Sequence, residues 1–253
     1  MPNEETDDLG DRSSGGSSGG VAEPEAVVNP PATDWQAHFV REEARYRDGE
    51  RRLPDAADPD ARQRQLTRLG NAAWGAGLAL MMAGRREEAD EWFVRAADRY
   101  AESFPDAPPG SWGRPIGAMK AHILAGDWTA ATSAACWALG AGAADATSPI
   151  GRYAAALAEL VVGDDDAARG HADALRTSEE FPAPVGDALA FIAARDIVGY
   201  TEAAEAVLKS FETRDEYLED VPVADTVLVL QALAERRGLG TPLASPLLPV
   251  APG

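Results

Sequence analysis

Histidine and cysteine, which often carry chemistry, are both scarce in this 253-residue sequence. It has one cysteine, Cys136, and three histidines, His38, His122 and His171. No histidine stands in a His-x-x-x-His, Glu-x-x-His or Cys-x-x-Cys spacing, which would present two ligands to one metal ion. The sequence also lacks a Gly-x-x-x-x-Gly-Lys-Ser/Thr phosphate loop and a Gly-x-Ser-x-Gly nucleophile turn. We therefore expect no metal site, no cofactor and no catalytic residues.

Three consecutive aspartates, Asp164–Asp166, are the most concentrated set of carboxylates and could be read as a divalent cation site. They directly follow Gly163, at a turn between two helix-length segments. An aspartate at that place caps the next helix, and its neighbours interact with the positive end of the helix dipole. We interpret Asp164–Asp166 as a helix start. Cys136 lies in the apolar helical context "SAACWAL", which predicts a buried and unreactive thiol.

The net charge of −19 excludes whole classes of partner. Binding to nucleic acid or to an anionic membrane surface needs concentrated Lys and Arg. Two explanations of the acidity remain open. The acidic field can steer a basic partner, or the excess carboxylates can keep a protein hydrated at high salt. Only Lys120 and Lys209 are lysines and the other 21 basic residues are arginines, a composition that resembles the proteins of extreme halophiles.

The ends of the sequence and its hydropathy indicate a cytoplasmic location. No apolar run approaches the roughly 20 residues of a membrane-spanning helix. The first residues, "MPNEETDD", are acidic, whereas a secretory signal is basic and then apolar.

Composition divides the chain into three parts. Residues 1–33 are rich in Gly, Ser, Pro and acid, which predicts a disordered tail. Residues 34–240 form helix-length blocks separated by Gly and Pro, with Thr33 or Asp34 as the first N-cap and a second helix beginning near Pro59. Residues 241–253 form a proline-rich C-terminal tail. No segment alternates with period two over a useful length, so we predict an all-α domain.

A short pattern recurs within the helical part and gives its organisation. A glycine separates two apolar helical segments, and an alanine stands five residues later, small enough for two helices to approach closely. We predict a helix-turn-helix unit at each of these pairs: Gly84 and Ala89, Gly126 and Ala131, Gly163 and Ala168, and Gly199 and Ala204.

In this respect residues 60–215 resemble the tetratricopeptide repeat family. The first unit carries the resemblance best: with Ala89 on the conserved small residue, Gly77 and Phe93 fall on the first-helix glycine and the second-helix aromatic. Later units lose the aromatics and are longer than about 34 residues, and an alanine-rich helical bundle is the alternative. The resemblance implies a right-handed α-solenoid of about four helix-turn-helix repeats. A last helix, from Asp220 to Gly238, would cap the stack.

In that family the first helices of successive units line a concave groove, so the resemblance implies ligand contacts there. Besides alanine and aliphatic residues, these helices offer Trp74 and Met81. With the loop before the second unit, they also nominate a cationic and aromatic set: Trp112, Arg114, Lys120, His122, Arg152, Tyr153 and Arg195. The cations could take a peptide carboxylate or an acidic helix. Alternatively, the aromatics are core between helices.

We therefore expect a non-enzymatic interaction or scaffold module that binds a peptide or partner helix in this groove. One alternative is an immunity- or antitoxin-like inhibitor of a basic partner. A second is an enzyme or small-ligand binder with its pocket between Trp112, Lys120 and Tyr153.

Overall fold

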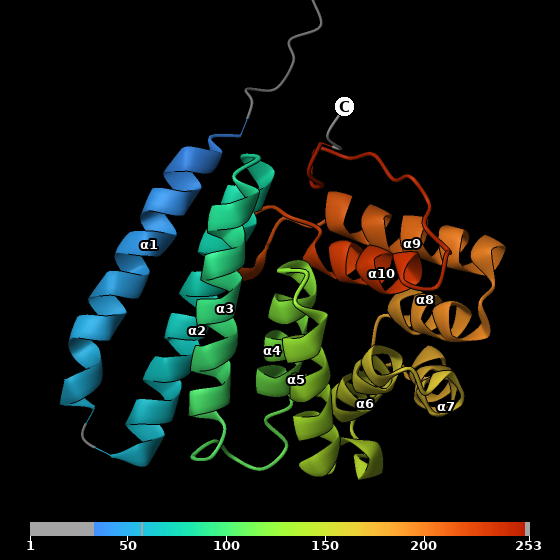
Figure 1. The fold of residues 1–253 in the computed structure, drawn as a ribbon, viewed down its shortest axis with the longest axis horizontal. Coiled ribbons are helices and arrows are strands. Elements are labelled where there is room, and N and C mark those ends of the chain that lie inside the picture. The colour runs from blue at the N-terminus through green and yellow to red at the C-terminus, as the bar shows by residue number, and fades with distance from the viewer. Residues whose placement is uncertain (1–32, 57, 251–253) are drawn as a thin grey trace, which may run out of the picture. The chain divides into compact units, whose positions relative to one another are not determined.

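The computed structural model describes residues 33–56 and 58–250. The chain divides into residues 1–33 and 34–253, and the second part is described by itself; the predicted disordered tail lies outside the described residues. The described residues form ten α-helices and no strand, which confirms the all-α prediction (Figure 1). The helices are α1 (Trp35–Arg52), α2 (Pro59–Met82), α3 (Arg86–Ser103), α4 (Gly113–Leu124), α5 (Trp128–Gly140), α6 (Pro149–Val162), α7 (Asp165–Arg176), α8 (Ala183–Ala194), α9 (Ile197–Glu212) and α10 (Asp225–Glu235).

Side-chain caps set where several helices begin. Asp34, Asp127 and Asp164 each accept a hydrogen bond from the backbone N–H three residues later, at the starts of α1, α5 and α7. Each bond satisfies one of the N–H groups that a first turn leaves without a helical partner. The predicted capping roles of Asp34 and Asp164, and the start of α2 at Pro59, are thereby confirmed.

Helices adjacent in sequence pack against each other in pairs: α2 with α3, α4 with α5, α6 with α7, and α8 with α9, while α1 packs on α2. Gly84, Gly126 and Gly163 end the first helix of the first three pairs with φ of 75°, 73° and 90°. These values lie in the left-handed region that glycine enters without steric cost. The alanines five residues later, Ala89, Ala131 and Ala168, are fully buried between helices.

The fourth turn differs from the prediction, and placing Gly199 there was wrong. Gly199 lies inside α9, where an added Cβ would stand 2.5 Å from the ring of Phe191 in the preceding helix. The turn residue is Arg195, with φ of 55°. The smallness of Gly199 therefore serves the packing of α9 on α8. Tyr200 is buried five residues after the true turn, and Ala204 is buried one helical turn further on.

Helix α10 also departs from the expected position. It begins at Asp225, because residues 218–220 form a separate short 3-10 turn, so the predicted start at Asp220 was wrong. It contacts α4 as well as α8 and α9, so it does more than cover the last pair. In Figure 1, α10 lies beside α8 and α9, and its axis runs crosswise to the upright helices α2 to α4. The apolar stripe that faces inward is fully or almost fully buried: Val227, Leu230, Leu233 and Ala234.

The segment after α10 packs against the helices as far as it is described. Leu248 is buried, and the carbonyl oxygen of Leu247 accepts a hydrogen bond of 2.9 Å from the N–H of Ala224. Leu243 and Leu247 are partly buried against the same core, whereas Val250 is 94% exposed. None of the described helices is long and apolar enough to cross a membrane.

Candidate binding site

Lys120 on α4 is the predicted groove residue with the most constrained surroundings. Its Nζ atom lies 2.6 Å from Oδ2 of Asp225, the first residue of α10. The same atom lies 5.3 Å from the ring centroid of Trp74, within the range of a cation–π contact. Burial alone would lower the pKa of Lys120, but the carboxylate of Asp225 and the nearby Tyr153 raise it on balance. Lys120 is therefore a cation with its counter-charge supplied by the chain itself.

A second ion pair holds the other end of α10. Arg237, just beyond the helix, donates to Oδ1 of Asp165 at 2.5 Å and to the carbonyl oxygen of Leu160 at 2.7 Å. Its side chain is only 7% exposed. Asp165 opens α7 and Leu160 belongs to α6, so α10 runs from α4 to the turn between α6 and α7.

The groove predicted from the sequence is therefore occupied at Lys120 by the chain's own C-terminal helix. Lys120 does meet a carboxylate on a helix, but that carboxylate is Asp225. Of the predicted set, the structure brings Lys120 and Tyr153 together: each alters the pKa of the other, and the phenol of Tyr153 is buried.

The remaining predicted residues do not join them in one site. Trp112 packs beside Gly151 at the start of α6, where its Nε1 atom leaves no room for a Cβ, so it fills a gap between helices. Arg195 is at the α8–α9 turn, 66% exposed and 3.3 Å from Asp165, and thus outside the groove. Arg152 lies near His171 and contributes, after burial, to lowering the pKa of that histidine.

His122 lies on α4 close to acidic residues of two other segments. Burial lowers its pKa, and Asp127 and Asp98 oppose that effect. Its Nδ1 atom is buried and has no hydrogen-bond partner among the described residues. Arg114 donates to Oε1 of Gln63 at 2.7 Å and lines a cavity together with Lys120.

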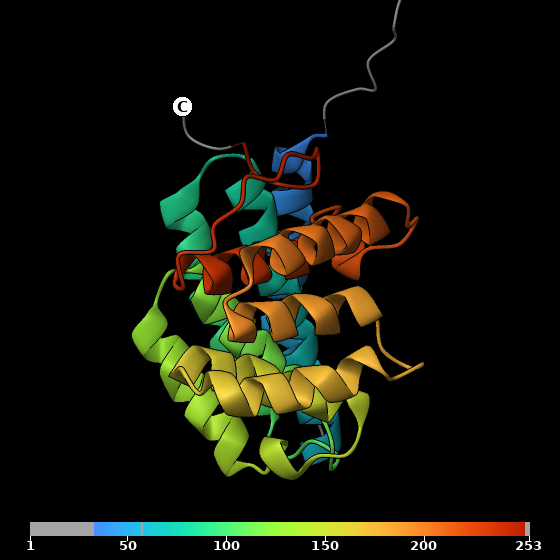
Figure 2. The ribbon, with the colours of Figure 1, turned by 90° about the vertical axis from the view of Figure 1, so that its right-hand side faces the viewer.

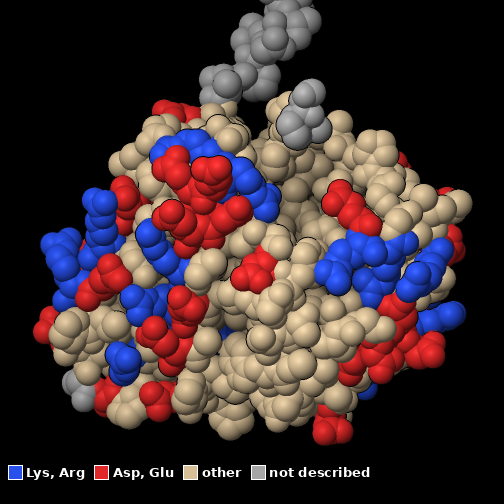
Figure 3. All heavy atoms as spheres, in the orientation of Figure 1, with Lys and Arg blue, Asp and Glu red and all other residues tan. Residues whose placement is uncertain are grey.

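A spacious cleft in the described part has a volume of about 840 Å³. It lies between the turns of the first two helix pairs, at Gly84 and Gly126, and the outer side of α10. Apolar side chains form most of its wall: Met81, Ile123, Leu124, Trp128, Leu228, Ala232, Pro249 and Val250. Figure 3 shows the surface hollowed near the top centre, between the charged left side and the C-terminal segment. A cleft of this size and lining is suited to binding an apolar group.

Sequence reasoning found only part of this cleft. It nominated Met81 and the two turn glycines, but it missed Trp128, Leu228 and Arg236. Arg236 lies over the ring of Trp128, with its Cζ atom 4.2 Å from the centroid, at the edge of the cleft. These two residues are 108 positions apart (236 − 128), and no local signal in the sequence indicates that α10 returns to the second turn.

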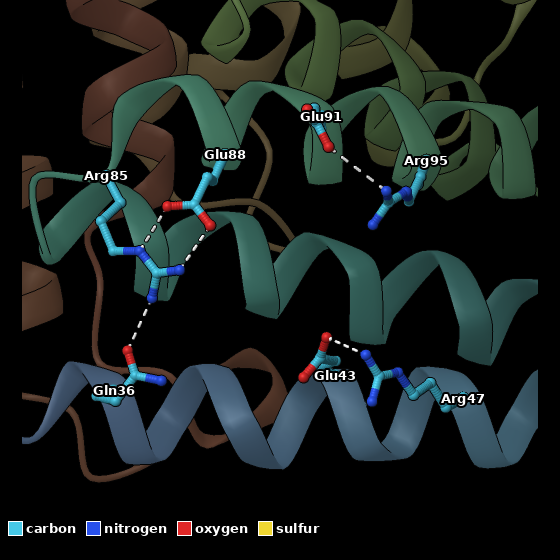
Figure 4. Close-up of polar contacts among 7 residues, drawn as sticks. All are labelled: Gln36, Glu43, Arg47, Arg85, Glu88, Glu91 and Arg95. Carbon is cyan, nitrogen blue, oxygen red and sulfur yellow. Dashed lines mark hydrogen bonds and ion pairs between the residues drawn. The ribbon is translucent and has the colours of Figure 1, made fainter.

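The arginine-rich side of the molecule offers a different kind of surface. Residues 34–103 carry 12 arginines and 14 acidic residues. Figure 4 shows that its pairs mostly join residues on one helix: Arg47 with Glu43 at 2.7 Å, and Arg95 with Glu91 at 3.5 Å. Arg85 binds both carboxylate oxygens of Glu88 and reaches Gln36 on α1 at 2.8 Å. Because ten of the 12 arginines form ion pairs in place, this face is not a basic patch.

In the parts of the chain that the structure describes, no group of three or more His, Cys, Asp or Glu side chains could hold a metal ion. Cys136 is exposed, so the prediction of a buried thiol was wrong. It stands on the outer face of α5, whose inner alanines, such as Ala135, are buried instead.

The fold and the cleft are those of an all-α protein built from packed helix pairs. No protein-family model, no curated protein and no solved structure matches the chain.

Proposed function

We propose that the chain is a cytoplasmic, tetratricopeptide-like interaction module, a right-handed α-solenoid of four helix pairs that binds a partner helix without catalysing a reaction. Two features support the solenoid. Each pair packs on the next, through contacts of α3 with α4, α5 with α6, and α7 with α8. The later pairs are also turned relative to the earlier ones, since the yellow and orange helices lie across the upright blue and green ones (Figure 2).

The single observation that carries the binding function is the cleft of about 840 Å³ beside α10. The packing of α10 is the reason to expect a helical partner, because these helix pairs already accept one amphipathic helix of the chain itself. It is an 11-residue helix with an inward apolar stripe, and it packs across α4 and α8. A partner helix laid along its outer side would bury Leu228 and Trp128, which are only partly buried now, in the same way. The proposed binding surface thus lies on the turn side of α10, away from the groove residues.

Cross-linking tests this function directly. A photoreactive residue at Gln231, which lines the cleft, should cross-link a partner when the full chain is expressed in its source cells at native salt. The same residue at Ala44, exposed on α1, should not. Ala232→Glu, placed at the cleft wall, should abolish the Gln231 cross-link, whereas Ala44→Glu should leave it intact. Equal cross-linking from both positions, or none from Gln231, would reject the cleft as the binding surface. A strongly basic partner that links at acidic surfaces elsewhere would favour an inhibitor of a basic protein.

A further inference from the structure

A second, smaller cavity has chemistry that partner binding at the α10 cleft does not use. Its volume is about 230 Å³, and it lies between α2, α3 and α4, with Leu218 and Asp225 at its other side. It shares no lining residue with the cleft of 840 Å³. It is smaller than the clefts of roughly 300–1,000 Å³ that hold drug-sized molecules. Its size suits a compact ligand with a single ring or a short branched chain.

The charges on the cavity wall do not cancel. Three charged residues line it, the cations Arg114 and Lys120 and the anion Asp225. Asp225 and Lys120 form the buried pair at the start of α10. Arg114 has no carboxylate within ion-pair distance among the described residues, and its one polar contact is with the neutral amide of Gln63. Burial lowers the pKa of Arg114 with no opposing carboxylate, and its Nε atom is buried without an acceptor. Arg114 is thus a half-buried cation without a counter-charge, and an anion bound beside it would neutralise it.

The rest of the wall is aromatic and uncharged. Trp74 and Tyr100 line it beside Ile116. The ring of Tyr100 is held in place, because an added Cβ at Gly117 would lie 2.6 Å from it. The hydroxyl of Tyr100 donates to Oδ1 of Asn71 at 2.9 Å, which leaves the amide nitrogen of Asn71 as a donor at the cavity. Rigid aromatic walls favour a flat apolar body, and the amide adds a second donor for an acidic group.

We propose that this cavity binds a small organic monoanion, a carboxylate on an aromatic ring or a short branched chain, with its carboxylate at Arg114 and its body against Trp74 and Tyr100. One negative charge balances the single uncompensated cation of the wall. A dianion would bring a second charge close to Asp225. Because the cavity is formed by helices that pack together only in the folded chain, binding of the ligand stabilises the folded state by mass action.

Three probes that differ in one property each test the proposal on the full chain. Benzoate carries both the charge and the ring, benzamide keeps the ring without the charge, and acetate keeps the charge without the ring. Calorimetric titration should show saturable binding of benzoate and at least about tenfold weaker binding of the other two, a difference of about 1.4 kcal/mol. Benzamide binding as tightly as benzoate would overturn the proposal. Absence of saturable benzoate binding, together with no rise in melting temperature at millimolar benzoate, would overturn it as well.

Variants show where on the chain benzoate binds. Arg114→Met should weaken benzoate binding at least tenfold, and Arg62→Met, on the exposed side of α2, should leave it unchanged. Leu218→Trp at the 53% exposed rim should block the cavity without altering any charge, which covers the case in which Arg114→Met does not fold. Equal loss in Arg62→Met, or full binding by Leu218→Trp, would place benzoate elsewhere and reject the cavity.

Discussion

The arginine-rich side of the molecule, which residues 34–103 form and which we call the α1–α3 face, differs from the two ends of α10 in how it uses ion pairs. The α1–α3 face has many pairs, most of them between neighbours on one helix and exposed to solvent; Arg47 and Arg95 are 70% and 45% exposed. Helix α10 has two pairs, one at each end, and both join elements far apart in the sequence. Lys120 and Asp225 are only 13% and 14% exposed, and Arg237 is 7% exposed.

The number of ion pairs in a region does not by itself determine how strongly they affect the stability of the fold. Exposed pairs contribute little, because water and salt already stabilise the separated charges. A buried pair contributes no large net stability either, but removing one partner leaves a charge without solvation or counter-charge. We therefore expect the ends of α10 to be sensitive to substitution and the α1–α3 face to be tolerant.

The largest effect is expected for Lys120→Met. Methionine fills a similar volume but leaves the carboxylate of Asp225 buried and unpaired, at a cost of about 3 kcal/mol in the free energy of unfolding. Urea denaturation measures the loss. The other lysine is a matched control, since Lys209 is 71% exposed and Lys209→Met should change stability by less than about 0.5 kcal/mol. Similar losses in the two variants would show that the burial of Lys120 has no energetic consequence.

Asp165 allows a buried and an exposed ion pair to be compared at the same carboxylate. Asp165 accepts from Arg237, which is 7% exposed, and from Arg195, which is 66% exposed. Arg237→Met should cost about 2 kcal/mol, because it also removes the hydrogen bond to the Leu160 carbonyl. Arg195→Gln should cost less than about 0.5 kcal/mol. Thermal and urea unfolding of both variants gives the comparison, and a larger loss for Arg195→Gln would contradict it.

Added salt should weaken the repulsion among the exposed carboxylates of the chain. Residues 104–253 carry 21 acidic and 10 basic residues, so repulsion among exposed carboxylates opposes folding at low salt. If the acidity is an adaptation to high salt, circular dichroism should show the melting temperature rising steeply from low to molar salt. A flat profile would instead favour a basic partner as the reason for the acidity.

A weaker dependence on pH is expected from the histidines. Burial lowers the pKa of His38, His122 and His171 in the folded state. The unfolded chain therefore takes up protons first as the pH falls through about 6.5, and their contribution to stability, present above that pH, is lost below it. Protonation of Glu42, whose pKa burial raises, works in the opposite direction.

The contribution of His122 to this pH dependence of stability is the difference between the wild-type chain and a variant without that histidine. Between about pH 7.5 and about pH 5.5, on either side of the ordinary histidine pKa, His122→Gln should lose less stability than the wild-type chain, because glutamine does not titrate. The groups that face His122, Asp98 and Asp127, remain in both proteins. An identical pH profile for the two proteins would show that His122 does not contribute to the slope.

The sequence predicts the helices and most of their starts because those features are local. Asp34, Asp127 and Asp164 identify helix starts within a few residues of sequence, and the turn glycines are marked by position alone. The fourth turn could not be found in this way, because Arg195 adopts a left-handed conformation for which arginine gives no local signal. Gly199 is small for a different reason, the approach of Phe191.

The candidate sites depend on distant pairs, and only part of them could be predicted. The scarcity of lysine among the basic residues draws attention to Lys120. Its partner, Asp225, lies 105 residues away, and the sequence gives no indication that a C-terminal helix occupies the groove. The contact of Arg236 with Trp128, which shapes the cleft, is of the same long-range kind.

The smallest effect is expected on the α1–α3 face. Glu43→Gln removes the partner of Arg47 but leaves both side chains in contact with water, so the free energy of unfolding should change by about 0.2–0.5 kcal/mol. A double-mutant cycle with Arg47→Gln, followed by urea denaturation, measures the coupling between the two residues. The coupling should fall further in molar salt, because the pair is exposed. A coupling above about 1 kcal/mol would mean that these arginines act as a network across α1 and α3, in which case the number of pairs, as well as their burial, would determine how this surface stabilises the fold.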